Sequence, residues 1–143
     1  ISAFYHDSAA CLVQDGKIVS QGHNNPVKEL EHICQPKCIR FGIQSRTESM
    51  IGACAHAEEH ALWGAVQAGI PLNECDMYVA LVGVDGLPRF RQEPVNTCLR
   101  CAVQIHFAGV RNIHVDVKDK WIAIKSGEEL TNALAYAQGE KKT

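Results

Sequence analysis

Two short motifs place histidine, cysteine and glutamate at spacings that suit metal chemistry. His56-Ala57-Glu58 sets a carboxylate two residues after an imidazole, and Cys98-Leu99-Arg100-Cys101 sets two thiols three residues apart. Thiols with this spacing point the same way on one helical turn, and the positive end of a helix dipole favours their thiolate form. The two cysteines can therefore share one metal ion.

One imidazole and two thiolates make three protein ligands for a zinc ion. Three ligands leave the fourth tetrahedral position open for water, which is the arrangement of catalytic rather than structural zinc. Zinc lowers the pKa of such a water toward neutrality, and a carboxylate two residues from the imidazole can reach that water without being a ligand. We therefore expect His56, Cys98 and Cys101 to bind Zn²⁺, with Glu58 as the catalytic acid and base.

Hydrolytic deamination of a nucleobase needs these groups. Hydroxide must attack an sp² ring carbon, the ring nitrogen must be protonated and the leaving amine needs a proton; one glutamate can move all three protons. His-x-Glu followed by Cys-x-x-Cys resembles the signature of the zinc-dependent cytidine and deoxycytidylate deaminase superfamily, and the resemblance spans about Ala9 to Val117. It implies a zinc-dependent deaminase, a hydrolase acting on amidine C–N bonds. The fold that it implies is α/β, a three-layer α/β/α arrangement with a mixed five-stranded sheet.

The resemblance also assigns two substrate contacts. Asn24, at the end of Ser20-Gln21-Gly22-His23-Asn24, matches the family asparagine that contacts the sugar, and Ala57 matches the position whose backbone amide meets the base carbonyl. The implied substrate is a cytosine-type base in a free nucleotide or nucleoside. A polynucleotide cytidine deaminase and a tRNA adenosine deaminase are the alternatives. Because these small domains usually associate as dimers, tetramers or hexamers, we expect a homo-oligomer.

Three features depart from the family pattern. Thr97 stands where the family usually has proline directly before the first cysteine, so we expect a locally different loop. The residues before Ala9 are too few for the helix that usually precedes strand one, so that N-terminal helix lies in a missing part or another chain covers that face of the sheet. Residues 118–120 are too short for the helical crossover of the deoxycytidylate and tRNA-adenosine branches. They predict an antiparallel hairpin, as in the free-nucleoside branch, whereas the His-x-Glu form points away from that branch.

The sequence also allows other interpretations of its possible zinc ligands. A structural zinc at the first site would show a fourth ligand. The stretch from His56 to His60 also fits the His-x-x-Glu-His pattern of zinc peptidases, which leaves the cysteine pair unexplained. A zinc-stabilised binding module without catalysis would have no use for Glu58. A second, structural zinc, with free thiols as the alternative, could lie in the long loop on Cys34, Cys38, Cys54 and His32.

The secondary structure predicted around these residues mixes strands and helices in an α/β order. β-prone runs at Ala9–Val13 and Lys17–Gln21 flank Asp15-Gly16, a strong hairpin signal. Trp63 and Trp121 favour core positions. The remaining expected elements are a loop over 22–47, a helix over 48–68, a strand over 77–84, a helix over 98–108, strands over 112–117 and 121–124, and a helix over 126–138 opened by a Ser126/Glu129 capping box.

Bulk composition limits the remaining possibilities. At 143 residues the chain suits one domain, residues 1–143, and its net charge of −2 gives no general attraction to a polyanion. The sequence contains no run of about twenty apolar residues, so it does not predict a membrane-spanning helix. Seven cysteines cannot all pair, which favours a reducing compartment, and we expect a cytoplasmic protein without a membrane partner.

Overall fold

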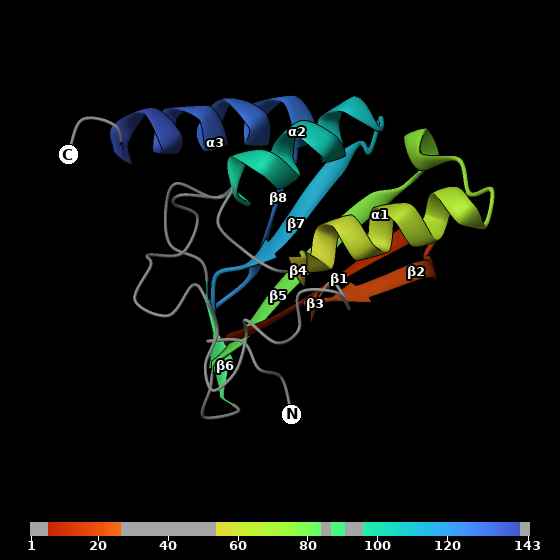
Figure 1. The fold of residues 1–143 in the computed structure, drawn as a ribbon, viewed down its shortest axis with the longest axis horizontal. Coiled ribbons are helices and arrows are strands. Elements are labelled where there is room, and N and C mark those ends of the chain that lie inside the picture. Colours follow the sequence, from red (N-terminus) through yellow and green to blue (C-terminus); the bar gives the residue numbers. More distant parts are fainter. Residues whose placement is uncertain (1–5, 27–53, 84–86, 91–95, 141–143) are drawn as a thin grey trace.

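The described part of the protein is built on a mixed β-sheet (Figure 1). The computed structural model describes residues 6–26, 54–83, 87–90 and 96–140. The main sheet has the order β2-β1-β5-β7-β8, so the expected mixed five-stranded α/β sheet is confirmed, and a short β6 adds to the side of β5. Its strands are β1 (His6–Gln14), β2 (Lys17–His23), β5 (Asp76–Gly83), β6 (Pro88–Arg89), β7 (Asn112–Asp116) and β8 (Trp121–Lys125).

Strand directions follow from the connections between the strands. β1 and β2 form the predicted hairpin, with Asp15 and Gly16 at φ of 50° and 76° in its turn. β1 also pairs with β5 in antiparallel fashion, and β5 pairs with β7 in parallel. β7 and β8 are antiparallel, so the hairpin predicted from the short 118–120 connection is confirmed.

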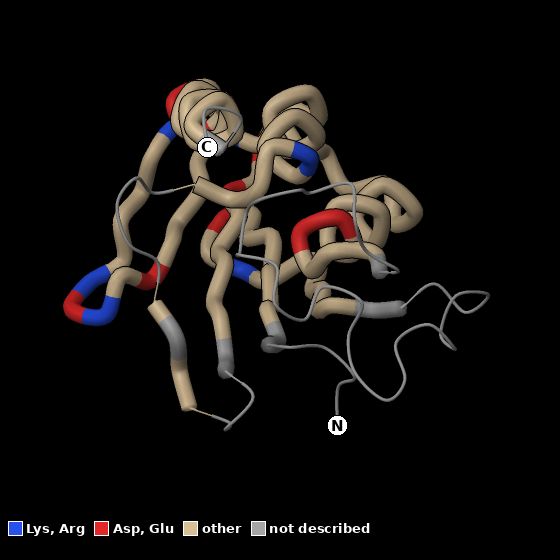
Figure 2. Tube along the Cα trace, turned by 60° about the vertical axis from the view of Figure 1, so that its left-hand side comes forward, with Lys and Arg blue, Asp and Glu red and all other residues tan. Residues whose placement is uncertain are grey.

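Three helices, α1 (Ala57–Gln67), α2 (Leu99–Phe107) and α3 (Ser126–Glu140), form one layer over the sheet (Figures 1 and 2). α1 packs on β1 and β2, and α2 lies between α1 and α3. The core side chains Leu12, Met77 and Ile113 are fully buried, and the alternating residues of these strands are more exposed. The described residues thus account for the sheet and one helical layer of the expected three-layer fold. Among them, no helix is long and apolar enough to cross a membrane.

Two boundaries were predicted wrongly near the chemistry-bearing residues. The helix expected over 48–68 begins only at Ala57, because β4 (Cys54–Ala55) pairs with β3 (Asn25–Pro26) and holds the preceding backbone extended. The same pairing places Asn25 and Pro26 in a strand rather than in a loop. Residues 27–53 lie outside the described part of the chain.

Three side-chain predictions were also wrong. Glu129 does not cap α3, because its carboxylate accepts hydrogen bonds from Thr97, and the Ser126 hydroxyl instead pairs with His106. Trp63 is 60% exposed on the outer side of α1, and Trp121 is 47% exposed beside Tyr78 on the sheet. Sequence periodicity places these residues on helices and strands, but it does not say which face another element covers.

Candidate metal centre

His56 and Cys98 occupy equivalent positions, each directly before the first residue of a helix. Both have extended backbone, with φ and ψ of −71° and 158° at His56 and of −66° and 156° at Cys98. Cys101 lies one turn into α2. The N–H groups of a first helical turn have no intrahelical acceptor, and together with the helix dipole they favour negative charge at these positions.

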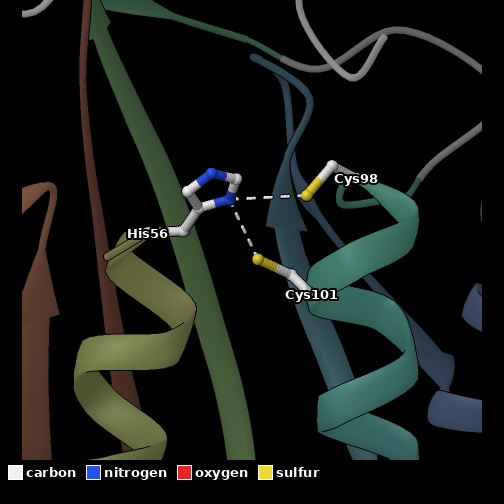
Figure 3. A group of neighbouring side chains, drawn as sticks. All are labelled: His56, Cys98 and Cys101. Atoms are coloured by element: carbon white, nitrogen blue, oxygen red, sulfur yellow. Dashed lines mark hydrogen bonds between the residues drawn. The ribbon is translucent and has the colours of Figure 1, made fainter. Parts of the chain in front are cut away.

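The three expected ligands converge on one point (Figure 3). His56 Nδ1 lies 3.2 Å from Cys101 Sγ and 3.4 Å from Cys98 Sγ, and all three donor atoms are within 4.8 Å of one another. Tetrahedral zinc, with Zn–S near 2.3 Å and Zn–N near 2.0–2.1 Å, would separate such donors by roughly 3.6 Å. One imidazole and two thiolates therefore fit zinc in both chemistry and spacing, with His56 binding through Nδ1.

The two thiols differ in acidity. Hydrogen bonding from Cys101 lowers the pKa of the Cys98 thiol, and His56 lowers it further. The same contact with Cys98, together with full burial, raises the pKa of Cys101 above its ordinary value. Burial alone would lower the pKa of His56, but Cys98 and, after it, the charge of Glu58 outweigh burial, so that this pKa is raised. Because metal ligation needs both thiolates and a neutral imidazole, zinc binding must release protons from this group.

Glu58 lies in the first turn of α1 and is only 4% exposed. After Cys98, which has the stronger effect, its negative charge raises the pKa of His56. It also raises the pKa of Cys101, after the stronger effects of Cys98 and of burial. Glu58 therefore acts electrostatically on two of the converged donors without belonging to their group. It is placed to exchange protons with a molecule bound beside them.

Glu59 joins the two helices that carry the ligands. Its Oε1 accepts hydrogen bonds from the His56 backbone N–H at 2.9 Å and from Arg100 Nη2 at 2.6 Å. Its Oε2 accepts from Arg100 Nε at 3.1 Å and from Gln104 at 3.0 Å. Burial would raise the pKa of Glu59, but these donors outweigh it and hold the carboxylate ionised. Sequence reasoning missed this residue; glutamate at the third helical position, as in a capping box, was the available signal.

The two predicted substrate contacts lie close together in the fold. Ala57 opens α1 and packs on β2 so tightly that a Cβ on Gly22 would be 2.3 Å from the Ala57 carbonyl oxygen. Asn24 follows two residues after Gly22, and its Oδ1 accepts a hydrogen bond from the Ser8 hydroxyl. Both residues therefore lie where β2 ends and α1 begins, next to His56.

The structure describes one of the two alternative zinc sites in full and the other only in part. His60 Nδ1 contacts the His23 backbone at 3.3 Å and Glu59 binds Arg100, so the peptidase-like pattern does not converge on a metal. Within the described ranges, His56, Cys98 and Cys101 are the only group of three or more such side chains that converges. Of the second zinc set, Cys54 lies in β4, and the residues that lie outside the described part of the chain are His32, Cys34 and Cys38. That site stays a prediction.

Comparison with known proteins gives one family and one fold. The family described as the cytidine and deoxycytidylate deaminase zinc-binding region matches residues 6–117. Cytidine deaminase from Burkholderia pseudomallei has a similar fold, with a TM-score of 0.53 and 22% identity over 90% of this chain and 81% of that chain. No curated protein has a significantly similar sequence.

A deaminase from a cyanophage is a more distant structural match. The apo form of dCMP deaminase from the cyanophage S-TIM5 aligns with a TM-score of 0.47 and 17% identity, over 74% of this chain. Its complex with dCMP and dUMP aligns with the same TM-score at 18% identity. The chain spans only 62% of the length of that protein.

Proposed function

The chain belongs to the cytidine and deoxycytidylate deaminase family that shares this zinc-binding region, and from this premise we propose that it hydrolytically deaminates a cytosine-type base. The substrate is a free nucleotide or nucleoside. One observation carries the proposal: Glu58 is buried two residues after His56, and its charge acts on both His56 and Cys101. A zinc site with a purely structural role has no use for such a carboxylate.

Glu58 performs the proton transfers of the reaction. Zinc, held by His56, Cys98 and Cys101, supplies the Lewis acidity that makes water nucleophilic near neutral pH. Glu58 takes a proton from the attacking water and gives it to the ring nitrogen as the new C–O bond forms at the amine-bearing carbon. It then passes the second proton of that water to the amine, which leaves as ammonia while the carbonyl forms. Water is consumed and no oxidant or reductant is needed.

Ala57 and Asn24 hold the substrate. The backbone N–H of Ala57, in the first turn of α1, has no acceptor within the helix and is available to the carbonyl of the base. Asn24 contacts the sugar, and the Ser8 hydroxyl fixes its amide by donating to Oδ1. Both assignments come from the family resemblance. They are supported by the close packing of β2, which Asn24 directly follows, on the start of α1 at Ala57.

Two observations favour a small substrate over a polynucleotide. The antiparallel β7–β8 hairpin is the arrangement of the free-nucleoside branch. Lys and Arg positions along the described backbone are spread rather than clustered, and the charges of the β7–β8 turn alternate in sign (Figure 2). We also propose that the protein works as a homo-oligomer in the cytoplasm.

A substrate panel tests the proposal. The zinc-loaded protein is incubated with cytosine, cytidine, deoxycytidine, deoxycytidylate, adenosine, guanine and a single-stranded oligonucleotide, and ammonia release is recorded. We expect turnover of a cytosine-type nucleoside or nucleotide. Turnover of the oligonucleotide alone, or of nothing in the panel, would contradict the assignment.

A further inference from the structure

A buried carboxylate from α3 binds the residue directly before Cys98. Glu129 Oε1 accepts a hydrogen bond from the Thr97 backbone N–H at 3.2 Å and another from the Thr97 hydroxyl at 2.5 Å. Thr97 is fully buried and Glu129 is 1% exposed. The contact joins residues 32 positions apart and links the last helix to the start of α2.

The Glu129 carboxylate occupies an unfavourable environment. Its Oε2 is buried and has no hydrogen-bond partner among the described residues. Burial raises its pKa to about 7, although the hydrogen bonds from Thr97 act in the opposite direction. Burying an ionisable group costs free energy unless its contacts offset that cost, so the two bonds to Thr97 are the clear structural gain from placing a carboxylate there.

We propose that Glu129 is a positioning residue for the zinc ligand Cys98. By accepting hydrogen bonds from both the N–H and the hydroxyl of Thr97, Glu129 fixes the backbone directly before Cys98. Cys98 itself has an extended backbone, and its Sγ lies 3.4 Å from His56 Nδ1. Without this anchor, Thr97 can shift and Cys98 Sγ moves away from its place beside the other donors. Groups that orient metal ligands typically change metal affinity by about 10–100-fold when removed.

Position 97 gives this contact a specific chemical basis. A proline here, as expected from the family pattern, has no N–H and no hydroxyl to donate, so it could not bind Glu129. Threonine supplies both donors. Threonine in place of the family proline therefore provides the hydrogen-bond donors that the buried carboxylate of Glu129 accepts. This inference concerns zinc binding and holds whichever base the protein deaminates.

Zinc affinity tests the inference directly. It is measured by competition with a chelator for Glu129→Leu, which keeps the side-chain volume without an acceptor, and for Glu129→Gln, which keeps an acceptor oxygen. We expect about a tenfold or greater loss of zinc affinity for Glu129→Leu and near-normal affinity for Glu129→Gln. In the cobalt-substituted protein, Glu129→Leu should also alter the thiolate-to-metal absorption band.

The matched control is Glu128→Leu, which removes an exposed acidic residue from the same helical turn and should leave zinc affinity unchanged. Wild-type affinity and an unaltered cobalt spectrum in folded Glu129→Leu would overturn the inference, as would an equal loss in Glu129→Gln. If Glu129→Leu does not fold, Thr97→Val and Thr97→Ser test the same contact from the other side. Thr97→Val should weaken zinc binding several-fold and Thr97→Ser should not; wild-type affinity in Thr97→Val would overturn the inference.

Discussion

Arg100 binds Glu59 through two parallel contacts, with Nη2 2.6 Å from Oε1 and Nε 3.1 Å from Oε2. Arg100 lies between the two cysteine ligands on α2, and Glu59 also holds the backbone N–H of His56. A bidentate arginine–carboxylate pair is directional as well as attractive. It therefore sets the distance between the two helix starts on which the metal centre depends.

Replacing Arg100 by lysine should weaken this connection. Lysine keeps the positive charge but cannot bind both carboxylate oxygens in the same fork geometry. We expect Arg100→Lys to lower zinc affinity by about tenfold in chelator competition. Arg111→Lys is the matched control, because Arg111 is exposed and pairs with Asp76 away from the ligands. Equal zinc affinity in both variants would argue against a role of the pair in spacing the ligands.

Loss of one thiol should remove the metal. Cys98→Ala leaves two ligands, so we expect less than a tenth of the wild-type zinc content after dialysis, together with a lower melting temperature. Cys75→Ala is the control, since Cys75 is also buried but is not part of the converged group. Full zinc retention by Cys98→Ala would mean that this thiol is not a ligand.

A methyl group at position 22 should displace the start of α1. An added Cβ would lie 2.3 Å from the carbonyl oxygen of Ala57 and 2.5 Å from the amide nitrogen of Ala61. We expect Gly22→Ala to lower the free energy of unfolding by about 1–3 kcal/mol and to reduce turnover, because His56 and Glu58 move with α1. Gly139→Ala, where nothing lies within 4 Å, should be neutral or slightly stabilising. Urea unfolding measures both, and a neutral Gly22→Ala would show that the approach is not tight.

Glu129 should make stability depend on pH. Its pKa in the folded protein is raised to about 7 from an ordinary value of 4.5, so between these pH values the folded state holds a proton that the unfolded state has released. The stabilising contribution is therefore complete below pH 4.5 and is lost as pH rises through 7. We expect the free energy of unfolding of the zinc-loaded wild type to fall between pH 5 and pH 8 relative to Glu129→Gln. Urea unfolding of both proteins at the two pH values checks this, and a pH-independent difference would contradict it.

The ligands and the sheet were predictable because their signals are local or topological. His-x-Glu and Cys-x-x-Cys each fit within one helical turn, and the short 118–120 connection leaves only an antiparallel return for β8. The supporting contacts were not predictable in this way. Glu59 reaches Arg100 41 residues away and Glu129 reaches Thr97 32 residues away. Glu129 instead looked like part of a local cap, because sequence spacing gives no information on which distant donor a carboxylate meets.

The start of α1 could not be predicted either, because it also depends on a contact between distant residues. Helix-favouring residues extend upstream of His56, but Cys54 and Ala55 pair with Asn25 and Pro26 across a long stretch of chain. This tertiary pairing outweighs local helix propensity and leaves His56 as the residue before the helix. The boundary matters for chemistry, since it places the imidazole and Glu58 at the positive end of α1.

We expect Glu58 to transfer protons beside a zinc held by His56, Cys98 and Cys101. This proton-transfer role is tested most directly by measuring zinc content and ammonia release together for wild type, Glu58→Gln and the exposed control Glu74→Gln, using the best substrate of the panel. We predict one zinc per chain in all three proteins, a wild-type rate for Glu74→Gln, and a loss of about 10²–10⁴-fold for Glu58→Gln. If zinc-loaded Glu58→Gln released ammonia at the wild-type rate, Glu58 would not be the proton-transfer group.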